Sequence, residues 1–220
     1  MHIPILSVKN ICVDYTSNNS FLFPWERNKI FRAVENISFE IFEGETLGIV
    51  GETGSGKSTI AKAIINILKI SSGKILFKNN EISNLDEKSM RKYRKEIQMI
   101  FQDPLASLNP RMKVGEIISE PLITHYPNLD FKEVKNQVKD IMESVGLLPN
   151  QINRYPHEFS GGQCQRIGIA RSLILKPKFI ICDEPVSSLD VSIQAQVINL
   201  LKELQEKFKL TYIFITHDLN

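Results

Sequence analysis

The run GETGSGKST, residues 51–59, is the part of the chain whose residue types point most directly to chemistry. Gly51, Gly56, Lys57 and Ser58 fit the spacing G-x-x-x-x-G-K-[ST], which is typical of loops that bind nucleotide phosphates. Glycines allow the backbone to curl around an anion, and a helix start adds about half a positive charge. We expect Lys57 to contact the β- and γ-phosphates and the Ser58 hydroxyl to bind Mg²⁺. The residues expected to bind the nucleotide here are Gly51, Glu52, Thr53, Gly54, Ser55, Gly56, Lys57, Ser58 and Thr59.

The segments on either side of this loop have the character that a phosphate site requires. The apolar run TLGIV, residues 46–50, predicts a buried strand, and STIAKAIINIL, residues 58–68, predicts a helix. The alternative is a glycine-rich turn that holds no ligand. It is disfavoured because strand, loop and helix occur in the required order.

Two adjacent acidic residues, Asp183 and Glu184, end the apolar run in KFIICDEP, residues 178–185. Neighbouring side chains of a strand point to opposite faces, so Asp183 and Glu184 cannot perform the same task. We expect Asp183 to hold Mg²⁺ and Glu184 to polarise the water that attacks the γ-phosphate. Taken alone, the pair is also typical of an ordinary acidic turn at a strand end. The phosphate loop in the same chain favours the catalytic interpretation.

The run FSGGQCQR, residues 159–166, opens a predicted helix whose apolar residues recur at helical spacing. Its first residues form a second anion site at a helix start, and they are Ser160, Gly161, Gly162 and Gln163. One mononucleotide does not need two such sites in one subunit. The second site is therefore expected to complete a nucleotide bound to another subunit. The alternative, an N-cap serine with a glycine turn, is the one that the local pattern by itself favours.

These motifs, in this order, resemble the ATP-binding subunit of ATP-binding cassette (ABC) transporters over almost the whole chain. The resemblance identifies a glutamine loop centred on Gln102 in MIFQDP, a D-loop SSLD at residues 187–190, and a switch histidine, His217, in FITHD. It implies that Gln102 senses Mg²⁺ and the attacking water, and that His217 holds the γ-phosphate and positions that water. It also implies an aromatic residue stacked on adenine, for which Tyr15 is the candidate. The alternative for Tyr15 is a half-buried strand tyrosine.

The predicted fold class is α/β, a P-loop NTPase cassette with an N-terminal antiparallel β region, a RecA-like core and a helical subdomain. Alternation at Ile37, Phe39 and Ile41 predicts a strand. A mostly helical insert follows at residues 114–155, and one face of its main helix is predicted to carry Phe131, Val134, Val138, Ile141 and Val145. We expect a single domain, 1–220, in which 1–113 and 164–220 form the β and RecA-like core. Residues 114–163 are expected to form the helical subdomain, which includes the motif that the resemblance identifies as the family signature, Ser160 to Gln163.

Composition narrows the possible partners. The 220 residues carry 27 basic and 25 acidic side chains, a formal net charge of +2, and no basic face of the kind that binds nucleic acid is expected. The three cysteines are odd in number and lack metal-ligand spacing, which indicates a reducing cytosol. Because no apolar run approaches the roughly 20 residues of a membrane span, membrane passage must come from other subunits.

Two stretches of the sequence resemble importers in particular among the ABC transporters. The run DPLASLNPRMKVGEIISEPL, residues 103–122, resembles oligopeptide and dipeptide importer ATPases, and RYPHEFSGGQ, residues 154–163, has a lead-in typical of importers. The segment SNNSFLFPWERNKIF, residues 17–31, is similar to an insertion of some peptide-importer ATPases. The resemblance implies a second cassette subunit, identical or paralogous, two integral-membrane permeases and, indirectly, a solute-binding protein. It also implies a peripheral location on the cytoplasmic face of the membrane.

Two other classes of function stay open from the sequence: a non-catalytic or decayed cassette, and a soluble cassette ATPase that acts outside transport. The chain has neither the paired cassettes nor the long coiled coil typical of the soluble relatives. Its last residue follows His217 by three positions, where relatives continue, so the C-terminal part of the family domain is expected to be missing. Since chain ends tend to fray, this form is expected to bind ATP but to hydrolyse it poorly.

Overall fold

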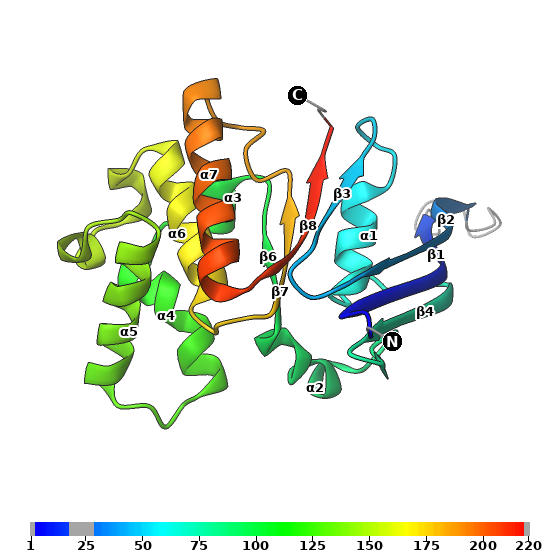
Figure 1. The fold of residues 1–220 in the computed structure, drawn as a ribbon, viewed down its shortest axis with the longest axis horizontal. Coiled ribbons are helices and arrows are strands. Elements are labelled where there is room, and N and C mark those ends of the chain that lie inside the picture. The colour runs from blue at the N-terminus through cyan, green and yellow to red at the C-terminus, as the bar shows by residue number, and fades with distance from the viewer. Residues whose placement is uncertain (1–2, 18–28, 218–220) are drawn as a thin grey trace, which may run out of the picture. The chain divides into compact units, whose positions relative to one another are not determined.

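The computed structural model describes residues 3–17 and 29–217 (Figure 1). Most of the segment at residues 17–31, predicted as an insertion, therefore lies outside the described residues. The chain divides into two compact units, one of residues 1–43, 49–91 and 217–220 and one of residues 44–48 and 92–216. The strand β3 (Thr46–Val50) contributes to both units, because the division falls between residues 48 and 49.

The first unit is built on an antiparallel sheet with the strand order β2-β1-β4-β5. Its elements are β1 (Leu6–Ser17), β2 (Lys29–Ile41), α1 (Lys57–Ile64), β4 (Ser72–Phe77), β5 (Asn80–Glu81) and α2 (Glu87–Met90). In the central strand β1, Leu6 lies opposite Ile41 on one side and Phe77 on the other. All three side chains are buried, so the core of this unit lies on that face of the sheet.

The second unit contains a parallel sheet with the order β3-β8-β7-β6, flanked by helices. Its further elements are η1 (Tyr93–Lys95), β6 (Ile97–Ile100), α3 (Pro104–Ser107), α4 (Val114–His125), α5 (Phe131–Ser144), η2 (Pro149–Asn153), η3 (Pro156–Glu158), α6 (Gly161–Leu173), β7 (Phe179–Asp183), α7 (Val191–Phe208) and β8 (Thr211–Thr216). Every residue of β7 is buried, as expected for an inner strand of a parallel sheet. The predicted α/β class, with an antiparallel and a parallel sheet, is thus confirmed.

The predicted helix in the insert is α5, and its limits have local causes. The Asp130 carboxylate accepts a hydrogen bond from the Lys132 amide at the start, and Gly146 takes a φ of 72° just beyond the end. Val134 is buried on the apolar face as predicted. Phe131, predicted on the same face, is 78 % exposed, because it is the first residue of the helix and precedes the turn that meets the core.

The helix α6 is the central helix of the second unit. It packs against α3, α4, α5, α7 and β6, and most of its residues are buried in the main apolar cluster of the unit. Three of its polar side chains, Gln165, Arg166 and Arg171, donate hydrogen bonds to backbone carbonyls of other segments. A helix held in this way is a rigid reference for the segments around it.

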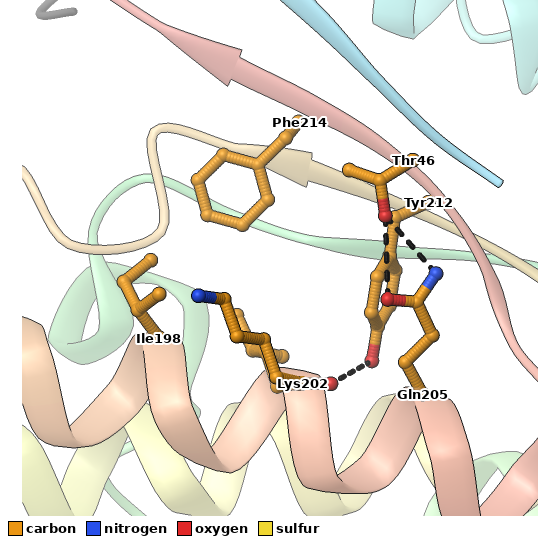
Figure 2. Close-up of a pocket in the computed structure, with 7 residues that line it drawn as sticks. Thr46, Ile198, Lys202, Gln205, Tyr212 and Phe214 are labelled. Carbon is orange, nitrogen blue, oxygen red and sulfur yellow. Dashed lines mark hydrogen bonds between the residues drawn. The ribbon is translucent and has the colours of Figure 1, made fainter.

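A cavity of about 290 Å³ lies between α7 and the β3 and β8 side of the parallel sheet (Figure 2). It is lined by Thr46, Ile198, Leu201, Lys202, Gln205, Tyr212 and Phe214. At its border the Gln205 Nε2 donates to the Thr46 Oγ1 at 3.0 Å, and the buried Tyr212 hydroxyl donates to the Leu201 carbonyl at 3.1 Å. None of the predicted site residues lines it, so we assign these contacts to the joining of helix and sheet.

Within the described ranges, none of the helices combines the length and the apolar character that a membrane crossing requires.

Candidate functional site

The phosphate loop lies in the first unit and connects β3 to α1, in the order that the sequence predicts. The prediction that this strand is buried is wrong, because no residue of β3 is buried and Val50 at its end is 42 % exposed. The Ser55 amide donates to the Glu52 carbonyl at 3.2 Å, which closes a turn within the loop. The ammonium group of Lys57 donates to the carbonyl oxygens of Gly51 and Glu52 at 2.6 and 2.7 Å. Since Lys57 is only 6 % exposed, its charge is held inside the loop by the curled backbone.

Two glycines of this loop have backbone conformations that other residues rarely adopt. Gly54 has a φ of 85° and Gly56 a φ of 93°. A Cβ at Gly56 would lie 2.4 Å from the carbonyl oxygen of Ala33 in β2, whereas a Cβ at Gly54 would meet nothing within 4 Å. Gly56 is therefore required both for the left-handed turn and for the close approach of the loop to β2.

The loop fits the phosphates of a nucleotide. Its helix α1 is capped by Gly56, which offers no side-chain oxygen, whereas α6 and α2 start at Ser160 and Asp86, whose side chains accept amide hydrogen bonds. A helix start without a side-chain cap, preceded by a glycine-rich loop with a buried lysine, is suited to an anion. Ser58 and Thr59 follow in the first turn of the helix, where a hydroxyl can reach a bound metal ion.

Tyr15 and Thr59 are brought together within the same unit. The Tyr15 hydroxyl lies 3.3 Å from the Thr59 Oγ1, and either oxygen can donate the hydrogen bond. Tyr15 comes from β1 and Thr59 from α1. With 40 % of its surface exposed, Tyr15 keeps area for stacking against a planar ring beside the loop.

Three of the predicted catalytic and metal residues gather in the second unit, where β7 ends. Asp183 is the last residue of β7, is 5 % exposed and lies opposite Ile215 of β8. The next residue, Glu184, donates its backbone N–H to the Ile215 carbonyl at 3.0 Å. Its carboxylate Oε2 accepts a hydrogen bond from the Nε2 of Gln102 at 2.9 Å. The predicted general base and the predicted glutamine of the loop after β6 are therefore in direct contact.

The backbone at Glu184 is unusual. Its φ is 46°, in the left-handed region that non-glycine residues seldom occupy. The following turn supports it, because the Ser187 hydroxyl and amide both donate to the Glu184 carbonyl, at 3.2 and 3.3 Å. Strain of this kind, about 1–3 kcal/mol, persists where the surroundings hold the residue in place, and it is concentrated at functional sites.

The signature residues form the start of α6. The Ser160 hydroxyl accepts from the Gln163 amide at 3.3 Å, and the Gln163 Oε1 accepts from the Ser160 amide at 3.0 Å. This reciprocal capping box is the structural role that the local pattern favours. Gly161 and Gly162 face the turn before α7 and α7 itself, since a Cβ would lie 3.5 Å from Leu189 and 2.6 Å from Ile193, respectively. The capping leaves this helix start exposed at Ser160 and Gly161.

The predicted site residues are divided between the two units. The phosphate loop and Tyr15 belong to the first unit, and so does His217, an exposed residue directly after β8. Gln102, Asp183, Glu184 and residues 160–163 belong to the second unit.

Two residues near the site were missed by sequence reasoning. The Gln165 side chain, only 1 % exposed, donates to the carbonyl of Pro185 at 2.6 Å. Arg171 donates through Nη1 to the carbonyl of Ser107 at 2.6 Å, and burial lowers the pKa of its guanidinium. The signal available in the sequence was a polar Gln165 at helical spacing from Ile169 on a largely apolar helix.

Comparison with known proteins gives the following likenesses. A family model described as ABC transporter matches residues 34–187. The chain is 55 % identical over 215 residues to the oligopeptide transport ATP-binding protein OppF of Salmonella typhimurium, covering 98 % of this chain and 64 % of that protein. It is 57 % identical to OppF of Haemophilus influenzae, with 98 % and 65 % covered, and 59 % identical over 191 residues to AppF of Bacillus subtilis, with 86 % and 57 % covered. The chain thus spans less than two thirds of the length of these curated relatives.

Solved structures agree with the sequence relatives. A dimeric post-hydrolysis state of the ATP-binding cassette MJ0796, bound to ADP and Pi, superposes with a TM-score of 0.84 at 30 % identity, covering 98 % of this chain and 89 % of that one. The structure of cbiO1 from Clostridium perfringens, part of the transporter complex cbiONQ, has a TM-score of 0.80 at 31 % identity, with 98 % and 79 % covered.

Proposed function

The chain belongs to the ABC transporter family, and we propose that it binds and hydrolyses ATP to energise the import of peptides or similar small solutes. The peptide assignment is supported by the relatives named as oligopeptide transport ATP-binding proteins. One observation supports hydrolysis above all others. The Gln102 amide holds the carboxylate of Glu184 at the end of a buried strand, directly beside Asp183.

In this proposal the phosphate loop binds the nucleotide. Lys57 contacts the β- and γ-phosphates, the backbone of residues 51–56 surrounds them, and Tyr15 stacks on the adenine. This role is supported by the positive charge of Lys57, which the curled backbone holds inside a glycine-rich loop of the kind that binds anions. The exposed area of Tyr15 beside Thr59 supports the stacking.

Ser58, Asp183 and Gln102 would hold Mg²⁺, and their hydroxyl, carboxylate and amide oxygens are the ligand types that this ion prefers. When bound, Mg²⁺ neutralises charge on the phosphate oxygens. Glu184 accepts a proton from the attacking water, and Gln102 orients its carboxylate through the contact at Oε2. His217 holds the γ-phosphate and the water in line.

We further propose that residues 160–163 complete the nucleotide site of a second cassette subunit. The exposed start of α6 supports this role, as does the dimeric state of the related cassette MJ0796. Two integral-membrane permeases and a solute-binding protein complete the complex. The chain then lies on the cytoplasmic face of the membrane, with residues 114–163 as its helical subdomain.

The test of hydrolysis is Glu184→Gln in the chain assembled with its membrane partners in proteoliposomes. Loss of a positioned general base typically costs about 10²-fold or more in turnover, while Mg-ATP binding is kept. Glu206→Gln is the matched control, because Glu206 is an exposed residue of α7. Phosphate release and Mg-ATP affinity are measured for both variants. Turnover of Glu184→Gln equal to that of the control would refute the role of Glu184 as the base.

A further inference from the structure

We propose that Gln165 and Arg171, both on α6, are positioning residues that hold the Gln102–Glu184 pair together by anchoring the chain that follows each member. The inference rests on the proposed function, because it concerns the base of the same hydrolysis reaction. It extends that function to two side chains of α6 that are not among the residues proposed to bind the nucleotide or Mg²⁺.

The first anchor acts on the segment after Glu184. Gln165 donates its amide Nε2 to the carbonyl of Pro185 at 2.6 Å, and the side chain is 1 % exposed. Pro185 is itself buried and immediately follows the left-handed residue Glu184. The anchored carbonyl belongs to the residue directly after Glu184, so this hydrogen bond fixes the backbone immediately beyond the proposed base.

The second anchor acts on the segment after Gln102. The Asp103 carboxylate caps α3 by accepting from the amides of Leu105 and Ala106 at 2.9 and 3.0 Å. At the end of this short helix, the carbonyl of Ser107 accepts a hydrogen bond from Arg171 at 2.6 Å. The segment from Gln102 to Ser107 is thus fixed to α6 at its far end.

The two anchors share one helix, and their targets meet at the catalytic pair. Gln165 and Arg171 are six positions apart on α6, which also packs against α3 and β6. The two anchored segments meet where the Gln102 Nε2 donates to the Glu184 Oε2 at 2.9 Å. Loss of either anchor frees one side of this contact. The base then spends less time in line with the attacking water, whereas the phosphate loop in the other unit keeps its own contacts.

The expected result is a split between turnover and nucleotide affinity. Misplacement of a reacting group by about 1 Å can cost 10²-fold, so we expect Gln165→Met to lower turnover about 10- to 100-fold and to change the KM for Mg-ATP less than about 3-fold. Methionine keeps the length of the side chain and removes the donor. Arg171→Met should act in the same direction, and Arg171→Lys, which keeps a donor on a long stem, should restore most of the turnover.

A matched control separates positioning from general loss of stability. Ser172 is a buried residue of α6, and its hydroxyl donates to the Ile169 carbonyl of the same helix at 2.8 Å. Ser172→Ala therefore removes a buried hydrogen bond from α6 without touching the segments after Gln102 or Glu184. It should lower the melting temperature and leave turnover per folded chain unchanged. If Gln165→Met and Ser172→Ala reduce turnover per folded chain equally, the positioning role is wrong.

The decisive measurement is a double-mutant cycle in the assembled complex. In the Glu184→Gln background, Gln165→Met should cost less than about 2-fold more, because the group that it positions is already lost. If the losses of turnover caused by Glu184→Gln and by Gln165→Met multiply in the double variant, the proposal is overturned. A fall in turnover for Glu184→Gln with none for Gln165→Met and Arg171→Met would overturn the anchors alone and leave the proposed function standing. No fall for Glu184→Gln would overturn the proposed function itself.

Discussion

A substitution to alanine at Gly56 tests the close approach between the phosphate loop and β2. Gly56 and Gly54 have similar positive φ values, 93° and 85°, but only Gly56 lies against another strand. The variant Gly54→Ala therefore changes the backbone preference alone. The variant Gly56→Ala adds a steric conflict with the carbonyl oxygen of Ala33.

The size of each effect follows from the geometry. A left-handed conformation costs an L-residue about 1–2 kcal/mol, partly offset by about 0.4–1 kcal/mol because alanine restricts the unfolded chain. Gly54→Ala should thus lower the free energy of unfolding by about 1 kcal/mol. At Gly56 the Cβ is 2.4 Å from the oxygen, about 0.6 Å short of the 3.0 Å that real contacts reach, and such overpacking adds about 1–3 kcal/mol.

The two variants are compared by thermal unfolding without nucleotide and by calorimetric titration with Mg-ADP. An additional loss of about 2 kcal/mol corresponds to a melting temperature about 4–8 °C lower for Gly56→Ala than for Gly54→Ala. Relief of the conflict has to move the loop or β2, so Gly56→Ala should also weaken Mg-ADP binding more. Equal melting temperatures would show that the loop does not lie against Ala33, and the assignment of Gly56 would be refuted.

Two further predictions concern other residues. Lys57→Ala removes a charge-assisted phosphate contact worth about 1.5–3 kcal/mol, so it should weaken Mg-ATP binding by the isolated chain. Ser160→Arg should leave that binding intact and abolish hydrolysis in the complex. If both variants lose Mg-ATP binding equally, the two-subunit site is contradicted. A side-chain hydrogen bond with Ser72 lowers the pKa of the partly exposed Cys12, and burial raises the pKa of Cys182. Since the thiolate is the nucleophile, iodoacetamide at neutral pH should modify Cys12 well before Cys182, and mass spectrometry of peptides would reveal the opposite order.

The parts of the fold that the sequence predicts well are those with local causes. The apolar run before Asp183 predicts β7, and its burial at every position follows from the two parallel neighbours of that strand. The end of α5 is predicted by Gly146, which takes the positive φ that terminates helices. Phe131 shows the limit of periodicity, because its spacing fits the apolar face and its position at the first turn leaves it exposed.

The candidate site also combines features that the local sequence predicts with features that it does not. Spacing alone predicts the phosphate loop and the curled backbone around Lys57. It does not predict the positive φ of Glu184, because that conformation is imposed by Ile215 and by the turn at Ser187. At Ser160 the local pattern favours capping and the resemblance favours a ligand; the structure contains the capping, and binding to a second nucleotide stays a prediction.

The helix α6 contains both an exposed start that a sequence motif identifies and inward polar side chains that no motif identifies. Its first residues, from Ser160, are exposed and close their own capping box, so they can meet a partner without disturbing the helix. Gln165 and Arg171 turn inward and donate to carbonyls beyond Glu184 and Gln102. Amide and guanidinium donors that reach carbonyls distant in sequence leave no local pattern, because the partner is a backbone atom present at every residue. On the proposed function, substitution of Gln165 or Arg171 should therefore lower hydrolysis although both side chains donate only to carbonyls of this chain.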